Sequence, residues 1–358
     1  MLFRSVHEGL GGVPLLCVHG WPETKRIWWR VVEPLADAGF EVIAPDLRGF
    51  GFSPRDALAL LDAASPAPTG PPRPSEPADA QGPEAVLRHL EALLAVLAEG
   101  RICLESLKDL TAGLATLRAD AALDDKGLAT ARRDLESFYT RDFAAEFLRR
   151  AGGSADVRPL YQALDDDSAF VQELYIRRNP NPIGSKFLLD AADDGSAYSK
   201  AHAKYHPFFR GLIEKYGVAD VFLIDAATGK IVYNVSKEVD LGGSLREGPL
   251  ASSSLGAAFQ QAASAGRRDA IGFGQFQRYL PSCNEPASFL AAPIYEGRTL
   301  VGAVAFQVPI DKANAIIGET TGMGRSGETY AVGPDRLFRS DSRFTKELGA
   351  TTTIINPD

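Results

Sequence analysis

Residues 220–235, DVFLIDAATGKIVYNV, decide the fold of the C-terminal part of the chain. Two apolar runs flank the segment DAATG, in which Gly229 can adopt the positive φ of a tight turn. Residues 288–306, SFLAAPIYEGRTLVGAVAF, repeat this arrangement around the segment EGR. Both stretches therefore predict β-hairpins.

A third pair of short apolar runs, at residues 329–332 and 337–340, flanks the turn segment GPDR. Three hairpins with helical stretches between them predict antiparallel sheets with helices on one side, an α+β architecture. The third pair is expected to open a second sheet lobe that runs out at Asp358.

The region that precedes the hairpins, residues 84–178, has a helical period. Leucines recur at spacings of three and four, as on one face of a helix, and aromatic residues continue the pattern further on. The members of this stripe are Leu90, Leu93, Leu94, Leu97, Leu107, Leu110, Leu114, Leu117, Leu135, Phe138, Phe143 and Phe147. They predict packed helices, in a hairpin or a coiled coil, and a homodimer through these helices is possible.

Residues 63–83, AASPAPTGPPRPSEPADAQGP, have no apolar period and are rich in Pro and Ala. Such a stretch cannot offset its ordering entropy by burial, which predicts an extended linker. We therefore expect five parts: a fragment at 1–58, a linker at 59–83, a helical segment at 84–178, a sheet lobe at 179–318 and the start of another lobe at 319–358.

Composition excludes several classes of partner and site. The net charge is −8 and no basic patch occurs, which argues against a nucleic-acid partner. The three cysteines are far apart and form no CxxC pair, so a disulfide framework or a cysteine zinc site is not expected. No cofactor is predicted.

The chain is also expected to be soluble, with the cytoplasm as its default location. Its first residues, MLFRSVHEGLGG, lack the apolar core of a signal peptide. No uncharged apolar run reaches the ~20 residues that a membrane helix needs.

Two short motifs near the N-terminus are LLCVHGWP at residues 15–22 and VIAPDLRGFG at residues 42–51. They resemble the first strands of α/β-hydrolases, above all epoxide hydrolases and haloalkane dehalogenases. The resemblance implies that the loop of His19, Gly20, Trp21 and Pro22 shapes an oxyanion hole.

An enzyme of that class also needs a nucleophile on a sharp elbow, a base and an orienting acid. No GxSxG and no comparable aspartate elbow occur in the sequence, and the elbow's place is taken by the Pro-rich segment. Loss of the triad costs several powers of ten in rate, so we predict no catalytic residues and an inactive fragment joined to a second protein piece as a fusion.

Many motifs of the remaining chain resemble, in order, the double Cache sensor of bacterial chemotaxis receptors and related cyclases and kinases. They are LYIRRNPNPIG at 174–184, DGSAY at 194–198, HAKYHPF at 202–208, DVFLID at 220–225, KEVD at 237–240, PID at 309–311, GETY at 327–330 and FRSDSR at 338–343. The resemblance implies a long helix carrying PAS-like sheet lobes, with a small ligand in the first lobe. It also implies flanking membrane helices, an extracytoplasmic position and an output domain. From the sequence we expect this chain to lack the flanking helices and the output domain.

A PAS-like sheet covered by loops forms a concave site with apolar walls and a few polar groups. The candidate polar ligand contacts are His206, Tyr233, Lys237, Asp240, Asn284 and Asp311, and the candidate walls are Phe209, Phe222 and Phe289. The amino-acid-binding box of some Cache sensors is not visible, so an amino-acid ligand is not favoured.

Three motifs suggest other chemistry, and we assign each a structural role. His202 and His206 have metal-ligand spacing, but no third ligand is evident and Pro207 predicts a helix end there. The GxGxxG at residues 322–327 follows an expected helix and not a strand, which predicts a turn. The aspartates at 190, 193 and 194 lack EF-hand spacing and are expected to cap or turn the chain.

Three functions remain open on the sequence. The first is a ligand-binding sensor module without its output domain. The second is an α/β-hydrolase, and the third is a helical dimerisation protein whose lobe has lost its ligand. We favour the first.

Overall fold

The computed structural model describes residues 5–8, 13–16, 40–45, 83–310, 314 and 338–347, with side chains from Leu90 onward. The chain divides into two compact units, Met1–His89 and Leu90–Asp358. The predicted third hairpin, the GxGxxG motif, Asp311 and residues 19–22 lie outside the described residues.

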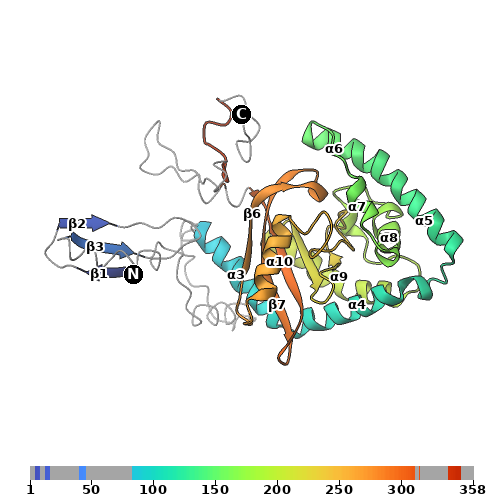
Figure 1. Cartoon of the computed structure of the whole chain (residues 1–358), viewed down its shortest axis with the longest axis horizontal. Coiled ribbons are helices and arrows are strands. Elements are labelled where there is room, and N and C mark those ends of the chain that lie inside the picture. The colour runs from blue at the N-terminus through green and yellow to red at the C-terminus, as the bar shows by residue number, and fades with distance from the viewer. Residues whose placement is uncertain are drawn as a thin grey trace, which may run out of the picture. The chain divides into compact units, whose positions relative to one another are not determined.

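The first unit contains a three-stranded sheet. Its strands are β1 (Ser5–Glu8), β2 (Val13–Leu16) and β3 (Phe40–Pro45), in the order β1-β3-β2 (Figure 1). β2 pairs with β3 in parallel and β1 pairs with β3 in antiparallel fashion. The parallel pair agrees with the α/β pattern expected of this fragment.

The second unit begins with the predicted helical segment. Its members are α3 (Pro83–Glu99), α4 (Arg101–Asp120), α5 (Asp125–Ser137), the π-helical η3 (Phe138–Phe143), α6 (Ala144–Ala151), α7 (Arg158–Gln162), α8 (Asp166–Gln172) and the π-helical η4 (Glu173–Arg177). Two further helices follow, inside the span predicted as the sheet lobe: the 3₁₀-helical η5 (Lys186–Leu188) and α9 (Ala197–Tyr216). Side-chain oxygens of Asp124, Asp165 and Ser196 cap the N-termini of α5, α8 and α9. The leucine stripe of α4 is buried, and α4 packs along α9.

A five-stranded antiparallel sheet follows, in the order β5-β4-β8-β7-β6. Its strands are β4 (Asp220–Asp225), β5 (Ile231–Asn234), β6 (Gly272–Tyr279), β7 (Glu285–Glu296) and β8 (Thr299–Val308). The two predicted hairpins are β4–β5 and β7–β8, and their turns contain Gly229 and Gly297 at φ of +69° and +57°. The predicted architecture, helices followed by an antiparallel sheet, is confirmed.

Helices cover both faces of the sheet, which corrects the prediction of one side. Helix α10 (Ser254–Ser264) packs on β6, β7 and β8, as Figure 1 shows, and Gly274 lies against the Ser254 carbonyl. Gly302 lies against Leu107 of α4. Across the sheet, Gly274 of β6 is opposite Phe289 of β7, which is opposite Gln307 of β8. Gln307 and Gly302 are five positions apart on β8, and successive residues of a strand face opposite sides of the sheet. Gly274 and Gly302 therefore face opposite sides.

The predicted helix end at Pro207 is wrong, because α9 continues through Pro207 to Tyr216. Phe209 and Leu212, which follow the proline, are buried. Their burial offsets the hydrogen bond that a proline cannot donate. No helix among the described residues is long and apolar enough to cross a membrane.

Candidate functional site

Three of the predicted ligand contacts meet beside β5. His206 comes from α9, Tyr233 from β5 and Lys237 from the loop that follows β5. The Tyr233 hydroxyl lies 2.6 Å from His206 Nδ1, and Lys237 Nζ lies 3.1 Å from His206 Nε2. All three side chains are at most 1% exposed.

The tautomer of His206 follows from its other neighbour. Nε2 lies 2.6 Å from the Phe187 carbonyl oxygen, which can only accept a hydrogen bond. We therefore assign the proton to Nε2, so that Nε2 donates to Phe187 and Nδ1 accepts from Tyr233. In this tautomer Nε2 has no lone pair to offer to the Lys237 ammonium.

Lys237 is consequently an under-paired buried amine. Its remaining acceptor is the Val235 carbonyl at 3.3 Å, and no carboxylate of the described residues lies within 4.0 Å of it. Burial lowers its pKa to about 7, against the opposing pull of Asp220 and Asp190. Its backbone has φ of +54°, a conformation that costs a non-glycine residue energy.

His202 extends the cluster along α9. Its ring stacks on His206 and on Tyr175, both at 4.5 Å between centroids, and its Nδ1 bonds to the Asp190 carbonyl. The carbonyls of Phe187 and Asp190 thus close the segment 186–190 over both histidines, and we call this segment the roof. The structural role of the histidine pair stays a prediction.

A second cluster, of acidic groups, also lies at the C-terminal end of β5, around Asn234. The Asp240 carboxylate accepts from Asn234 Nδ2 and from the Tyr279 hydroxyl, both at 2.6 Å. Glu238, which is half-buried, accepts from the Ser282 hydroxyl at 2.5 Å. Asp220, which is 1% exposed, accepts three backbone N–H groups through Oδ1.

Burial raises the pKa of all three acids. The pKa of Glu238 rises to about 7 and that of Asp240 to about 6. The pKa of Asp220 is raised well above its usual range, with the charges of Asp240 and Glu238 adding to the effect of burial. Two buried oxygens of this cluster, Asp220 Oδ2 and Asn234 Oδ1, have no hydrogen-bond partner in the part of the chain that the structure describes. Such groups mark a site that is incompletely satisfied.

Aromatic rings line the two clusters. Phe209 lies 5.3 Å from Tyr233, while Phe289 lies 4.9 Å from Tyr279 and 5.9 Å from Phe222. The three phenylalanines are fully buried.

The predicted residues therefore fall into two groups. His206, Tyr233 and Lys237 form the first cluster, and Asp240 and Phe289 belong to the second. Asn284 lies in the turn after β6, with φ of +65°, and its side chain makes no hydrogen bond within the described residues.

Sequence reasoning missed Asp220, Glu238 and Tyr279 as members of the acidic cluster. Asp220 begins the DVFLID motif, and Glu238 stands with Asp240 in the KEVD motif. The motifs that contain two of these acids were therefore a signal for the cluster. Tyr279 lies on β6, a strand that the sequence did not predict. Two glycines in GFGQFQRY weaken its strand pattern.

Neutral His206 should make stability depend on pH. Burial and the Lys237 charge lower its pKa to about 4, below the unfolded value of about 6.5. The stabilisation is therefore complete above pH 6.5 and is lost as the pH falls toward 4. Between pH 7 and pH 5 the wild type should lose about 2 kcal/mol more free energy of unfolding than His206→Gln, measured by urea unfolding. The acids titrate alike in both proteins, so parallel pH profiles would contradict the assignment.

Comparison with known proteins gives a match for the N-terminal unit. Residues 13–62 match the family model of the alpha/beta hydrolase fold. An epoxide hydrolase of Caballeronia sordidicola is 46% identical over 54 residues, which are 15% of this chain and 16% of that protein. Epoxide hydrolase A of Mycobacterium tuberculosis is 45% identical over 61 residues, 16% of this chain and 19% of that protein. The chain thus spans less than a fifth of the length of these relatives.

Among solved structures, the sensor domain of the V. cholerae histidine kinase DctB aligns with this chain at 12% sequence identity. The alignment covers 54% of this chain and 60% of the DctB chain. The TM-score of 0.25 is too low to establish a shared fold. Residues 13–62 are therefore similar in sequence to the alpha/beta hydrolase fold family, and that match does not extend over the helices and the five-stranded sheet that follow.

Proposed function

We propose that the second unit is a small-molecule-sensing lobe whose ligand binds at Lys237. The observation that carries this proposal is the state of Lys237, which is buried, lacks a carboxylate partner and is held in a left-handed backbone conformation. Buried amines without partners are costly unless something else compensates them. A ligand that offers a carboxylate or carbonyl oxygen to Nζ would supply that compensation.

The surroundings support a polar ligand of moderate size. His206, which Tyr233 holds in place, lies beside Lys237, and aromatic rings supply apolar walls. The unused oxygens of Asn234 and Asp220 would orient polar groups of the ligand that reach the acidic cluster. Entry would require the roof to release its carbonyl contacts with the two histidines.

The finer assignment rests on the motif resemblance. A Cache-type lobe in a chemotaxis-type receptor would report ligand binding to an output domain through its helices. Binding of a homodimer partner through residues 84–178 belongs to the same proposal.

Thermal unfolding of the full chain tests the proposal against carboxylates, amines, amino acids and purines. A ligand at a hundred times its dissociation constant adds ~2.7 kcal/mol, which raises the melting temperature by several degrees. Lys237→Met should abolish the shift, and Asp240→Asn should weaken it. Lys200→Met, an exposed position on α9, is the matched control and should leave the shift intact.

Loss of response in Lys237→Met will not reflect unfolding, because replacing an under-paired buried amine by an apolar side chain is tolerated or stabilising. A melting temperature that no compound moves would contradict the sensor proposal. A shift that survives unchanged in Lys237→Met would place the ligand elsewhere.

A second candidate function is hydrolysis by an α/β-hydrolase, favoured by the match of residues 13–62 to that family model. It accounts for the N-terminal fragment, but it offers no role for the buried clusters of the second unit. We therefore place it behind the sensor proposal.

A further inference from the structure

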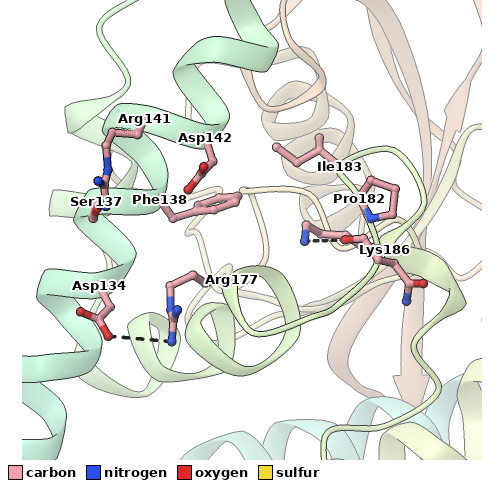
Figure 2. A pocket seen from close by; sticks show the side chains of 10 residues that line it. Asp134, Ser137, Phe138, Arg141, Asp142, Arg177, Pro182, Ile183 and Lys186 are labelled. Carbon is pink, nitrogen blue, oxygen red and sulfur yellow. Dashed lines mark hydrogen bonds and ion pairs between the residues drawn. The ribbon is translucent and has the colours of Figure 1, made fainter.

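An open cleft borders residues 181–186, at the start of the roof. Its volume is about 440 Å³, and its walls come from the α5–η3 helix and from the segment that follows η4. Figure 2 shows Ser137, Arg141 and Asp142 on the helical wall and Pro182, Ile183 and Lys186 on the opposite wall. Arg177 and Asp134 face each other across the cleft, 3.8 Å apart.

Both walls contain π-helical turns. Phe138, Arg141 and Asp142 belong to η3, and Arg177 closes η4. π turns are rare, because their hydrogen bonding is less favourable than that of an α-helix, and they are frequent at functional sites. Here they shape the two surfaces that enclose the cleft.

Lys186 is the most buried charge of the cleft, at 5% exposure. Its Nζ donates to the Asn181 carbonyl at 3.0 Å and to the Asn179 carbonyl at 3.3 Å, and it lies 5.8 Å from the centre of the Phe138 ring. No carboxylate of the described residues lies within 4.0 Å of it. The ammonium therefore has neutral hydrogen-bond partners only, and the attraction of Asp142, which lies beyond ion-pair distance, compensates its charge in part.

The other cations of the cleft differ in their pairing. Arg177 is neutralised by the fully buried Glu173, to which it donates two hydrogen bonds. Arg141 donates to the Ser137 hydroxyl and has no carboxylate partner among the described residues. One acid, Asp142, lines the same wall as Arg141 without an ion pair in the described part of the chain.

From this arrangement we propose that the cleft binds a small oxyanion, a carboxylate or phosphate group, through Lys186 and Arg141. Lys186 supplies a desolvated charge at the wall, where its attraction for an anion is weakly screened. Arg141 supplies a planar donor pair that matches carboxylate and phosphate oxygens. Asp142 opposes binding by like-charge repulsion and limits the affinity.

The site is separate from Lys237, although the same segment borders both. Lys186 lines the cleft, whereas the carbonyl of the next residue, Phe187, faces His206. The two lysines therefore belong to different sites, and substitutions at one should not remove binding at the other.

Calorimetric titration of the full chain with inorganic phosphate, and in a second arm with acetate, tests the proposal at constant ionic strength. Lys186→Met should weaken binding at least roughly tenfold, and Arg141→Gln by about threefold to tenfold. Arg141 is exposed, so its loss should not disturb folding. Asp142→Asn should tighten binding by a few fold, because it removes repulsion.

Arg267→Gln is the matched control, since Arg267 is exposed and lies outside the cleft; it should bind as the wild type does. Binding that persists in Lys186→Met and is lost in Lys237→Met would assign the anion to Lys237 and overturn this site. Binding of phosphate alone or acetate alone supports the site and identifies the oxyanion. Absence of binding for both anions up to about 20 mM would overturn it, as would an equal loss in Arg267→Gln.

Discussion

Asp220→Ala is expected to lower the free energy of unfolding by about 4 kcal/mol. The Asp220 carboxyl accepts from the backbone N–H groups of Val221, Val235 and Ser236 at 2.7, 2.9 and 3.0 Å. These groups tie the start of β4 to the loop that carries Lys237. Alanine removes this acceptor from the Val221 and Ser236 N–H groups, at a cost of about 1–3 kcal/mol each before relaxation. The Val235 N–H keeps the Val221 carbonyl as a second acceptor, at 3.2 Å.

Asp220→Asn is the informative companion of that variant. Its amide oxygen can accept the same three N–H groups, and it removes an acid that lies beside Asp240 and Glu238. Burial and the charges of these neighbours raise the pKa of Asp220, so the amide removes a charge that its surroundings disfavour. We expect stability within about 1 kcal/mol of the wild type by urea unfolding at pH 7. If Asp220→Ala and Asp220→Asn lost equal free energy of unfolding, the three backbone hydrogen bonds would not be the cause of the loss.

Gly274→Ala is expected to destabilise the second unit by at least about 3 kcal/mol. A Cβ atom at position 274 would lie 1.9 Å from the Ser254 carbonyl oxygen and 2.6 Å from its carbon. Backbone atoms cannot rotate away as a side chain would, so α10 would have to shift on the sheet. The variant should unfold at a lower urea concentration and expose the α10 face before the rest.

Gly211→Ala on α9 is its control. No atom lies within 4 Å of the added Cβ there, and alanine is the better helix former by about 1 kcal/mol. This variant should be as stable as the wild type or more so. If Gly274→Ala unfolds like Gly211→Ala, the contact between α10 and β6 is looser than the structure indicates.

The sequence predicted those parts of the fold whose signals are local. The β4–β5 and β7–β8 hairpins were predicted because apolar runs flank glycine turns, and α4 because its leucines repeat with a helical period. Strand β6 was not predicted, since GFGQFQRY alternates weakly and its glycines are needed for contact with α10. Helix α10 itself lies between the two hairpins, where helical stretches were expected.

The helix end predicted at Pro207 was wrong because tertiary packing outweighs the local signal. A proline predicts a helix end from local geometry, whereas the packing of Phe209 and Leu212 keeps α9 continuous.

The candidate site shows the same limit. Residue type and motif order placed His206, Tyr233 and Lys237 among the candidates, but nothing local indicates that Tyr233 and Lys237 meet a histidine of α9. Lys237 and Asp240 are three residues apart, and the sequence does not show that they belong to different clusters. That separation depends on how the loop after β5 turns, with Lys237 at positive φ.

The central claim is that a small ligand engages Lys237, and a structure of the full chain bound to the compound that moves its unfolding tests this most directly. The expected result is a ligand oxygen within hydrogen-bonding distance of Lys237 Nζ, with the roof displaced from His202 and His206. A ligand bound elsewhere, with Lys237 still between His206 and the Val235 carbonyl, would contradict it.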